Sequence, residues 1–255
     1  MTEVTIKSSV GKFEALYNHS KQLSAPIAIV IGADGTEEER YRKAANKLFE
    51  TFIKLDFSVL RFDFRKDKKN TKDYDVDTVN LLDLTAAVDW LHAKNNECKS
   101  FWLCGFEIGA YYGLQIVMRR PEIDNYMLLS PNMRKNDLGF VVPCSSSGVL
   151  VRASEDLKFL EEDCLNLQEK LTTKTESKIK YFTIYNAERD FDTELEQLSE
   201  ETTKYIEEKM NSGANGFHGS FNTKRRRRRK KKASDVDEDK IVYVNPIKEL
   251  DLDNI

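Results

Sequence analysis

The chain has 255 residues, 33% of them charged, and a formal net charge of −3 at pH 7. This length supports one large hydrophobic core, and the small net charge excludes a protein whose whole surface attracts nucleic acid or membranes. The sequence shows no signal peptide, no apolar run long enough to span a bilayer and no Cys-x-x-Cys pair among its four cysteines. We therefore expect a reduced, cytoplasmic protein without a transmembrane segment.

The order of predicted elements indicates the fold class. Uninterrupted apolar runs predict buried strands, and apolar residues at helical spacing predict amphipathic helices. In chain order, the elements are a hairpin (2–7 and 11–17), strand 27–31, helix 36–54, strand 57–64, helix 76–94, strand 101–104, helix 108–119, strand 126–129, strand 148–151, helix 157–173, strand 179–185 and helix 191–210. This alternation predicts a single α/β domain with a doubly wound, mostly parallel sheet. Active sites of such sheets lie at the carboxyl ends of the strands.

The composition changes abruptly at Asn211. Residues 1–210 read as the folded domain, and 211–240 as a flexible linker that is rich in Gly, Ser and Asn at its start and contains a basic run. The last segment, 241–255, contains a short apolar piece, Ile241–Val244, that could form an edge strand.

Residues 101–109, FWLCGFEIG, have the pattern of a nucleophile elbow, in which a strand, a tight turn and a helix follow one another. Gly105 and Gly109 stand where the sharp turn excludes larger side chains. The middle residue, which is serine in a G-x-S-x-G elbow, is Glu107. The turn is therefore expected to form without the usual nucleophile.

The order of elements and several local strings resemble a bacterial branch of the α/β-hydrolase superfamily, the small predicted hydrolases without a lid domain. The strings are FSVLRFDFR (57–65), FWLCGFEIGA (101–110), MRRPEI (118–123), LLSPNM (128–133) and IYNAERDF (184–191). The resemblance covers roughly residues 4–210 and implies an α/β-hydrolase-like fold.

The resemblance also implies where the catalytic triad would lie. The nucleophile position is Glu107, the acid position is Asp156 with Glu155 as the neighbouring alternative, and the histidine position is Arg189. The loop that helps to form the oxyanion hole in the family is here GADG (32–35). One triad member of three is kept, so these are vestigial triad positions and no intact catalytic set is expected.

The residue types at these positions do not support serine hydrolase chemistry. Glu107 has no hydroxyl, and a guanidinium such as that of Arg189 offers donors but no acceptor for a proton. None of the three histidines, His19, His92 and His218, stands at the base position. We expect instead that Glu107, Arg189 and Asp156 form an ion network; the alternative is that Glu107 points to solvent and Arg189 is an ordinary surface residue.

One acidic and one basic residue lie near the end of another predicted strand. Asp63 and Arg65 lie at the end of the predicted strand 57–64 and are interpreted as a strand-end ion pair. The sequence has no P-loop, no G-x-G-x-x-G and no H-E-x-x-H motif, so no cofactor and no metal site are predicted.

A run of nine basic residues gives the chain its most concentrated charge. The run is Lys224, Arg225, Arg226, Arg227, Arg228, Arg229, Lys230, Lys231 and Lys232. Adjacent cations repel one another, so the run must be solvated or paired, and phosphates would release counterions on binding it. A polyanionic partner (RNA, DNA or an acidic protein) is predicted; the alternatives are an anionic membrane surface and a solubilising loop that folds back on the acidic residues Asp235–Asp239.

Three functions remain open from the sequence. The favoured one is a pseudohydrolase that acts as a binding or scaffold module with a polyanion-directed tail. The second is an active α/β-hydrolase-class enzyme that acts on small esters or related substrates by an unconventional mechanism. The third is a structural subunit of a larger (ribonucleoprotein) assembly. The sequence does not indicate a ligand, a biological process or an oligomeric state.

Overall fold

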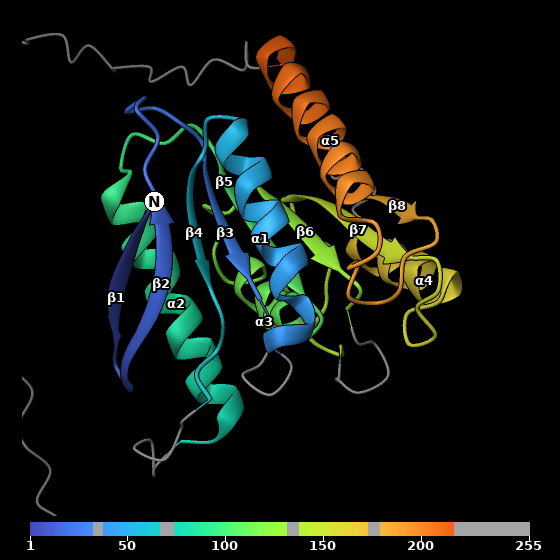
Figure 1. The fold of residues 1–255 in the computed structure, drawn as a ribbon, viewed down its shortest axis with the longest axis horizontal. Helices are drawn as coiled ribbons and strands as arrows, with labels where there is room; N and C mark the ends of the chain where they lie inside the picture. Colours follow the sequence, from blue (N-terminus) through green and yellow to red (C-terminus); the bar gives the residue numbers. More distant parts are fainter. Residues whose placement is uncertain (33–37, 67–73, 132–137, 173–178, 217–255) are drawn as a thin grey trace, which may run out of the picture. The chain divides into compact units, whose positions relative to one another are not determined.

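A computed structural model describes residues 1–32, 38–66, 74–131, 138–172 and 179–216 (Figure 1). Eight strands form one sheet in the order β1-β2-β4-β3-β5-β6-β7-β8. The strands are β1 (Thr2–Ser8), β2 (Gly11–Asn18), β3 (Ile27–Ile31), β4 (Ser58–Phe62), β5 (Phe101–Phe106), β6 (Asn125–Leu129), β7 (Ser147–Ala153) and β8 (Lys180–Ile184). The helices are α1 (Glu38–Lys54), α2 (Val76–Lys94), α3 (Ile108–Val117), α4 (Glu161–Leu171) and α5 (Leu195–Gly216).

The sheet is doubly wound and mostly parallel, which confirms the predicted fold class. β1 and β2 form an antiparallel hairpin and β2 joins β4 antiparallel, while β4, β3, β5, β6, β7 and β8 run parallel to one another. Parallel strands need crossover connections, and four of the five helices provide them. The carboxyl ends of the parallel strands consequently meet at one edge of the sheet.

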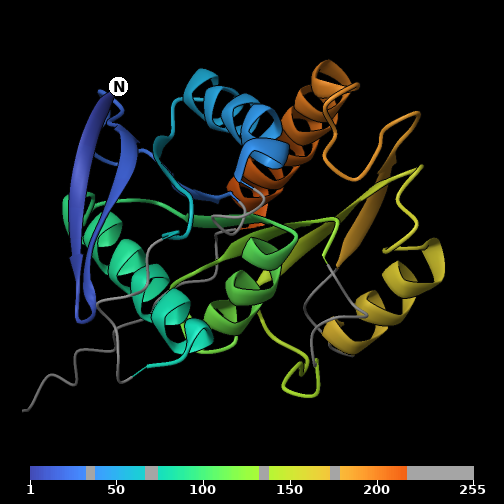
Figure 2. The same cartoon turned by 60° about the horizontal axis from the view of Figure 1, so that its bottom comes forward.

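The core consists of two apolar layers, one on each face of the sheet. Helices α2, α3 and α4 cover one face, and α1 and α5 cover the other (Figure 2). Successive side chains of a strand point to opposite faces. In β3, Ile27, Ile29 and Ile31 therefore pack in the first layer, whereas Ala28 and Val30 pack in the second. A strand buried on both faces needs apolar residues at every position, which explains the uninterrupted run in the sequence.

Two helices differ most from their predicted bounds. Helix α4 begins at Glu161 rather than at 157, because Asp156 accepts a hydrogen bond from the main-chain N–H of Lys158 (2.8 Å) and holds the preceding segment in a turn. Leu157, which matched the helical spacing, is 80% exposed. Helix α5 continues through Gly216, beyond the predicted domain end at residue 210. None of the helices in the described ranges is long and apolar enough to cross a bilayer.

The rest of the C-terminal part lies outside the described residues. This applies to the linker beyond residue 216, to the basic run 224–232 and to the segment 241–255. The domain boundaries predicted for them stay predictions. Residues 1–214 form one compact unit.

Candidate functional site

The elbow has the geometry of a strained turn at the carboxyl end of β5. Glu107 lies between β5 and α3 with φ 46° and ψ −103°, a backbone conformation that residues other than glycine rarely adopt. Its main-chain N–H donates to the carbonyl of Leu129 (3.0 Å), which ties the turn to β6. Backbone strain of this kind persists only where the surroundings enforce it.

The two glycines of the elbow are dictated by close backbone contacts. A Cβ atom at Gly105 would lie 2.4 Å from the carbonyl carbon and oxygen of Gly109. A Cβ atom at Gly109 would lie 2.6 Å from the carbonyl oxygen of Gly32, at the end of β3. The two glycines of the sequence pattern therefore mark the elbow, because the turn leaves no room for a side chain at either position.

Arg189 lies between the other two vestigial triad positions. Its Nη1 donates to both carboxylate oxygens of Asp156, at 3.0 and 2.8 Å. Its Nη2 lies 3.6 Å from Oε1 of Glu107. The structure thus brings together the three side chains that the sequence placed in one ion network, and it separates Asp156 from Glu155, which is exposed and accepts a hydrogen bond from Ser154.

The remaining donors of the Arg189 guanidinium are also used. Nη2 donates to the carbonyl oxygen of Ser130 (2.7 Å), and Nε donates to the phenol oxygen of Tyr41 (3.1 Å). The side chain of Arg189 is only 5% exposed, and that of Asp156 only 1%. Buried charges are stable only when they are paired and hydrogen-bonded, and the Arg189–Asp156 pair meets both conditions.

Tyr41 and Ser130 are the members of the site that the sequence did not indicate. Tyr41 occupies the apolar stripe of α1, and burial raises the pKa of its phenol, so the hydroxyl stays protonated at neutral pH. Ser130 takes part through its main-chain carbonyl, which no side-chain pattern reveals. Its position, at the carboxyl end of β6 and just before Pro131, was the one available signal.

Charged residues of α1 hold the Arg189 loop in place. Arg40 lies 3.4 Å from Asp190, Lys43 lies 2.6 Å from Asp192, and Lys47 pairs with Glu196 in α5. The three cations follow one another along one side of α1 at spacings of three and four residues. This spacing was visible in the sequence, but their partners were not.

The histidines in the described part of the chain lie away from the elbow. The Nδ1 atom of His19 is hydrogen-bonded to the hydroxyl of Tyr17 (2.7 Å) and lies near Ser58, the first residue of β4. His92, in the last turn of α2, lies against Phe101, the first residue of β5. Both therefore lie at the amino ends of the parallel strands, whereas the elbow lies at the carboxyl end. His218 lies outside the described residues.

The other candidate residues have structural partners. Asp63 pairs with Arg61 (2.9 Å) and Arg65 pairs with Asp83 (2.7 Å), so the predicted ion pair between Asp63 and Arg65 is wrong in its partners. Burial raises the pKa of the Cys104 thiol strongly, which makes it unreactive. Among the described residues, no group of His, Cys, Asp and Glu side chains is arranged to hold a metal ion.

A solved structure and a protein sequence are similar to this chain. No family model matches the chain. A crystal structure of ATU1826 from Agrobacterium tumefaciens, described as a candidate α/β hydrolase of unknown function, is 32% identical, covers 83% of this chain and 97% of that one, and superposes with a TM-score of 0.75. The uncharacterized protein RP471 of Rickettsia prowazekii (strain Madrid E) is 28% identical over 211 residues, which are 81% of this chain and 89% of that one.

A more distant structure has the same fold. It is an α/β serine hydrolase homologue from Coxiella burnetii, 18% identical, with a TM-score of 0.69 over 80% of this chain and 97% of that one. At this identity the likeness concerns the fold alone. The sheet order, the elbow at the end of β5 and the likeness to ATU1826 all agree with the resemblance that the sequence showed.

Proposed function

This chain belongs to the α/β-hydrolase superfamily, and from that premise we propose that it is a pseudohydrolase, a binding or scaffold module without hydrolytic activity. The observation that carries the proposal is the position of Arg189. Where the family's triad would have its histidine, a buried guanidinium donates hydrogen bonds to Asp156, Ser130 and Tyr41 and forms an ion pair with Glu107.

The chemistry at these positions supports the proposal. Serine hydrolysis needs a hydroxyl and a base that takes its proton, and the elbow offers a carboxylate beside a group that has no acceptor. Glu107 instead forms an ion pair with Arg189 and is the N-cap residue of α3, at the helix end where a negative charge is favoured. A stable ion network of this kind fits a structural role.

One observation favours the second candidate, hydrolysis through a covalent ester at Glu107. The turn keeps its strained φ of 46°, and strain of this kind gathers at active sites. Such a reaction also needs a base that activates water for the second step, and His19 and His92 lie at the opposite end of the strands. The pseudohydrolase is therefore the better supported of the two.

Hydrolysis assays on the full chain and on Glu107→Ala test the proposal. We expect both proteins to hydrolyse p-nitrophenyl acetate and 1-bromobutane no faster than a matched buffer blank. A purified esterase of known activity serves as the positive control for ester hydrolysis. Turnover by the full chain that Glu107→Ala abolishes would overturn the pseudohydrolase.

We also propose that the basic run 224–232 binds polyanions, because nine adjacent cations release phosphate counterions on binding. The expected result is retention of the full chain on heparin up to a salt concentration that a variant with Ser in place of these nine residues does not reach. Salt screens the contacts between the basic run and the sulfate groups of heparin, so both proteins should elute once the ionic strength is high enough. Elution of both proteins at the same salt concentration would refute the proposal.

A further inference from the structure

The edge strand β8 has main-chain groups that face away from the sheet. β8 is the last strand of the sheet order and pairs with β7. Ser154 donates its main-chain N–H to the carbonyl of Ile184 (2.9 Å), which fixes the phase of the ladder. In a parallel ladder alternate residues bond to the same neighbour, so residues 180, 182 and 184 bond to β7. The N–H and C=O groups of Tyr181 and Thr183 therefore point to the free edge.

Two glutamine side chains mark the ends of this open stretch. Oε1 of Gln197 accepts a hydrogen bond from the main-chain N–H of Tyr185 (2.8 Å), and Nε2 of Gln168 donates to the carbonyl of Ile179 (2.6 Å). Tyr185 and Ile179 have the same phase in the ladder as Tyr181 and Thr183. Side chains of the domain thus satisfy the outward-facing groups at both ends, and within the described residues no strand pairs with the groups between them.

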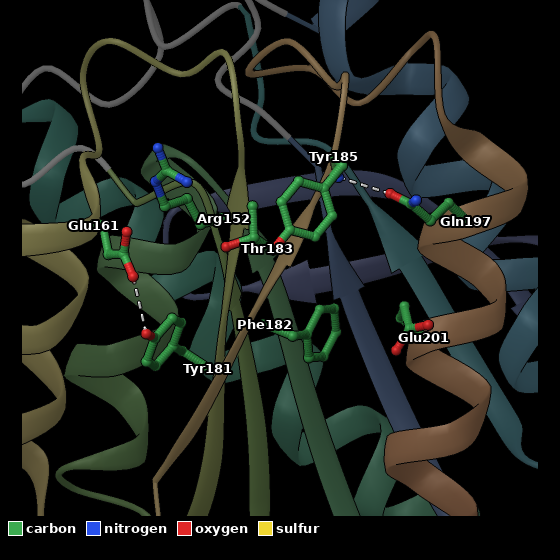
Figure 3. Close-up of a pocket in the computed structure, with 8 residues that line it drawn as sticks. All are labelled: Arg152, Glu161, Tyr181, Phe182, Thr183, Tyr185, Gln197 and Glu201. Atoms are coloured by element: carbon green, nitrogen blue, oxygen red, sulfur yellow. Dashed lines mark hydrogen bonds between the residues drawn. The ribbon is translucent and has the colours of Figure 1, made fainter.

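A pocket of about 510 Å³ lies along this stretch (Figure 3). It touches Tyr181, Phe182 and Thr183 in succession. Neighbouring residues of a strand point to opposite faces of the sheet, so a pocket that reaches all three must wrap around the strand edge. Figure 3 shows Glu161 at the start of α4 on one side of β8, and Gln197 and Glu201 of α5 on the other. A space of this form fits an extended chain that lies beside β8.

The two walls of the pocket carry negative charge. Glu161 accepts a hydrogen bond from the hydroxyl of Tyr181 (3.1 Å), and Glu201 lies on the opposite wall, where it pairs with Lys204. The exposed side chains of Glu162 and Glu200 lie next to them in the sequence. Arg152 is the cation among the lining residues. The excess of carboxylates favours a partner that carries positive charge.

The charge also argues against a second copy of the chain at this edge. A two-fold axis that pairs β8 with β8 brings the same faces together. Glu161 would then lie on the same side as Glu161 of the other copy, and Glu201 on the same side as its equivalent. Like charges across an interface are unfavourable, whereas a basic segment would meet both walls with opposite charge.

We propose that β8 is a docking edge that accepts an extended, basic peptide segment of a partner protein as a ninth strand. The main-chain groups of Tyr181 and Thr183 would bond to the peptide backbone, and Glu161 and Glu201 would select its basic side chains. This surface gives the proposed binding role a location. It does not depend on the elbow, since the test measures binding and not turnover.

The test uses the blocked peptide acetyl-Val-Lys-Lys-Val-Lys-Lys-Val-amide, whose lysines point to both faces of an extended strand, with the full-length protein. We expect it to bind more tightly at low than at high salt, and to slow hydrogen exchange of the Tyr181 and Thr183 amides. Its Glu-for-Lys counterpart should not bind. Thr183→Pro removes the outward N–H and is tolerated on an edge strand, so it should weaken binding about tenfold. Thr183→Ala keeps the N–H and is the matched control.

Circular dichroism and the thermal midpoint of unfolding establish whether Thr183→Pro is folded. Hydrogen exchange of the Tyr181 and Thr183 amides in the wild-type protein is a second readout, which needs no variant. Unchanged exchange on adding the Lys peptide, equal binding of the two peptides, or equal affinity of Thr183→Pro and Thr183→Ala would overturn the proposal. A dimer in sedimentation that Thr183→Pro dissociates would also overturn it, because the occupant would then be a second copy.

Discussion

Replacing Arg189 by alanine is expected to lower the free energy of unfolding by about 3–5 kcal/mol. The substitution removes both hydrogen bonds to the Asp156 carboxylate and leaves that carboxylate buried without its partner. It also frees the carbonyl of Ser130, which accepts from Arg189 at 2.7 Å. Removing one member of a buried pair costs more than the pair itself contributes, because the remaining charge stays desolvated.

Arg40→Ala is the matched control for this experiment. Arg40 also pairs with an aspartate of the same loop, Asp190, but its side chain is 42% exposed. Exposed ion pairs contribute at most about 1 kcal/mol, so this variant should unfold close to the wild type in urea. Similar losses for Arg189→Ala and Arg40→Ala would contradict a buried pair that supports the fold.

Gly105→Ala is expected to lower the free energy of unfolding by about 1–3 kcal/mol through overpacking. The new Cβ would lie 2.4 Å from the carbonyl carbon and oxygen of Gly109 and 2.6 Å from the main-chain nitrogen of Ala110. These atoms belong to the backbone at the start of α3, so the elbow itself would have to shift. Urea unfolding monitored by circular dichroism measures the loss.

The same substitution at Gly113 separates overpacking from a general effect of alanine. A Cβ there would lie 2.5 Å from Cδ2 of Leu103, the far end of a side chain that can rotate away. Gly113 lies inside α3, where alanine favours the helix by about 0.5–1 kcal/mol. Gly113→Ala should therefore be much closer to the wild type. A Gly105→Ala protein that is as stable as Gly113→Ala would show that the elbow backbone is not tightly packed.

The sequence predicted the sheet and the elbow because both rest on local rules, whereas the ion network rests on residues that are far apart in the sequence. Apolar runs marked the buried strands, and the small residues around Glu107 marked the turn. Asp156 and Arg189 follow strands that end at the same edge of the sheet, and this convergence brings them together in the fold. The resemblance to the family supplied the expectation that these positions belong together.

The remaining parts depend on contacts that the sequence does not encode locally. Leu157 matched a helical spacing, but the turn closed by Asp156 excludes it from α4. Arg65 pairs with Asp83 of α2, which is far away in the sequence, and not with Asp63. Asp63 pairs with Arg61, two residues before it, and that spacing places the two side chains on the same side of an extended chain. Tyr41 looked like an ordinary core residue of its helix.

The groove beside β8 could not be predicted from the sequence either. An alternating strand such as β8 gives no sign of whether a neighbour covers its second edge. The sheet order places β8 at the edge among the described strands, and the contacts of Gln168 and Gln197 show how the domain satisfies the ends of the strand. Glutamine side chains at these positions have no distinctive pattern in the sequence.

The central claim is that Glu107 is a structural carboxylate and not a nucleophile. If it attacked 1-bromobutane, bromide would leave and an alkyl ester would form; water would then attack the carbonyl carbon of that ester, release butanol and leave its oxygen in the Glu107 carboxylate. Mass spectrometry of the peptide that contains Glu107, after incubation of the full chain in heavy-oxygen water, detects this oxygen directly. We predict the same peptide mass with and without 1-bromobutane. A heavy oxygen in Glu107 that depends on 1-bromobutane would contradict the account.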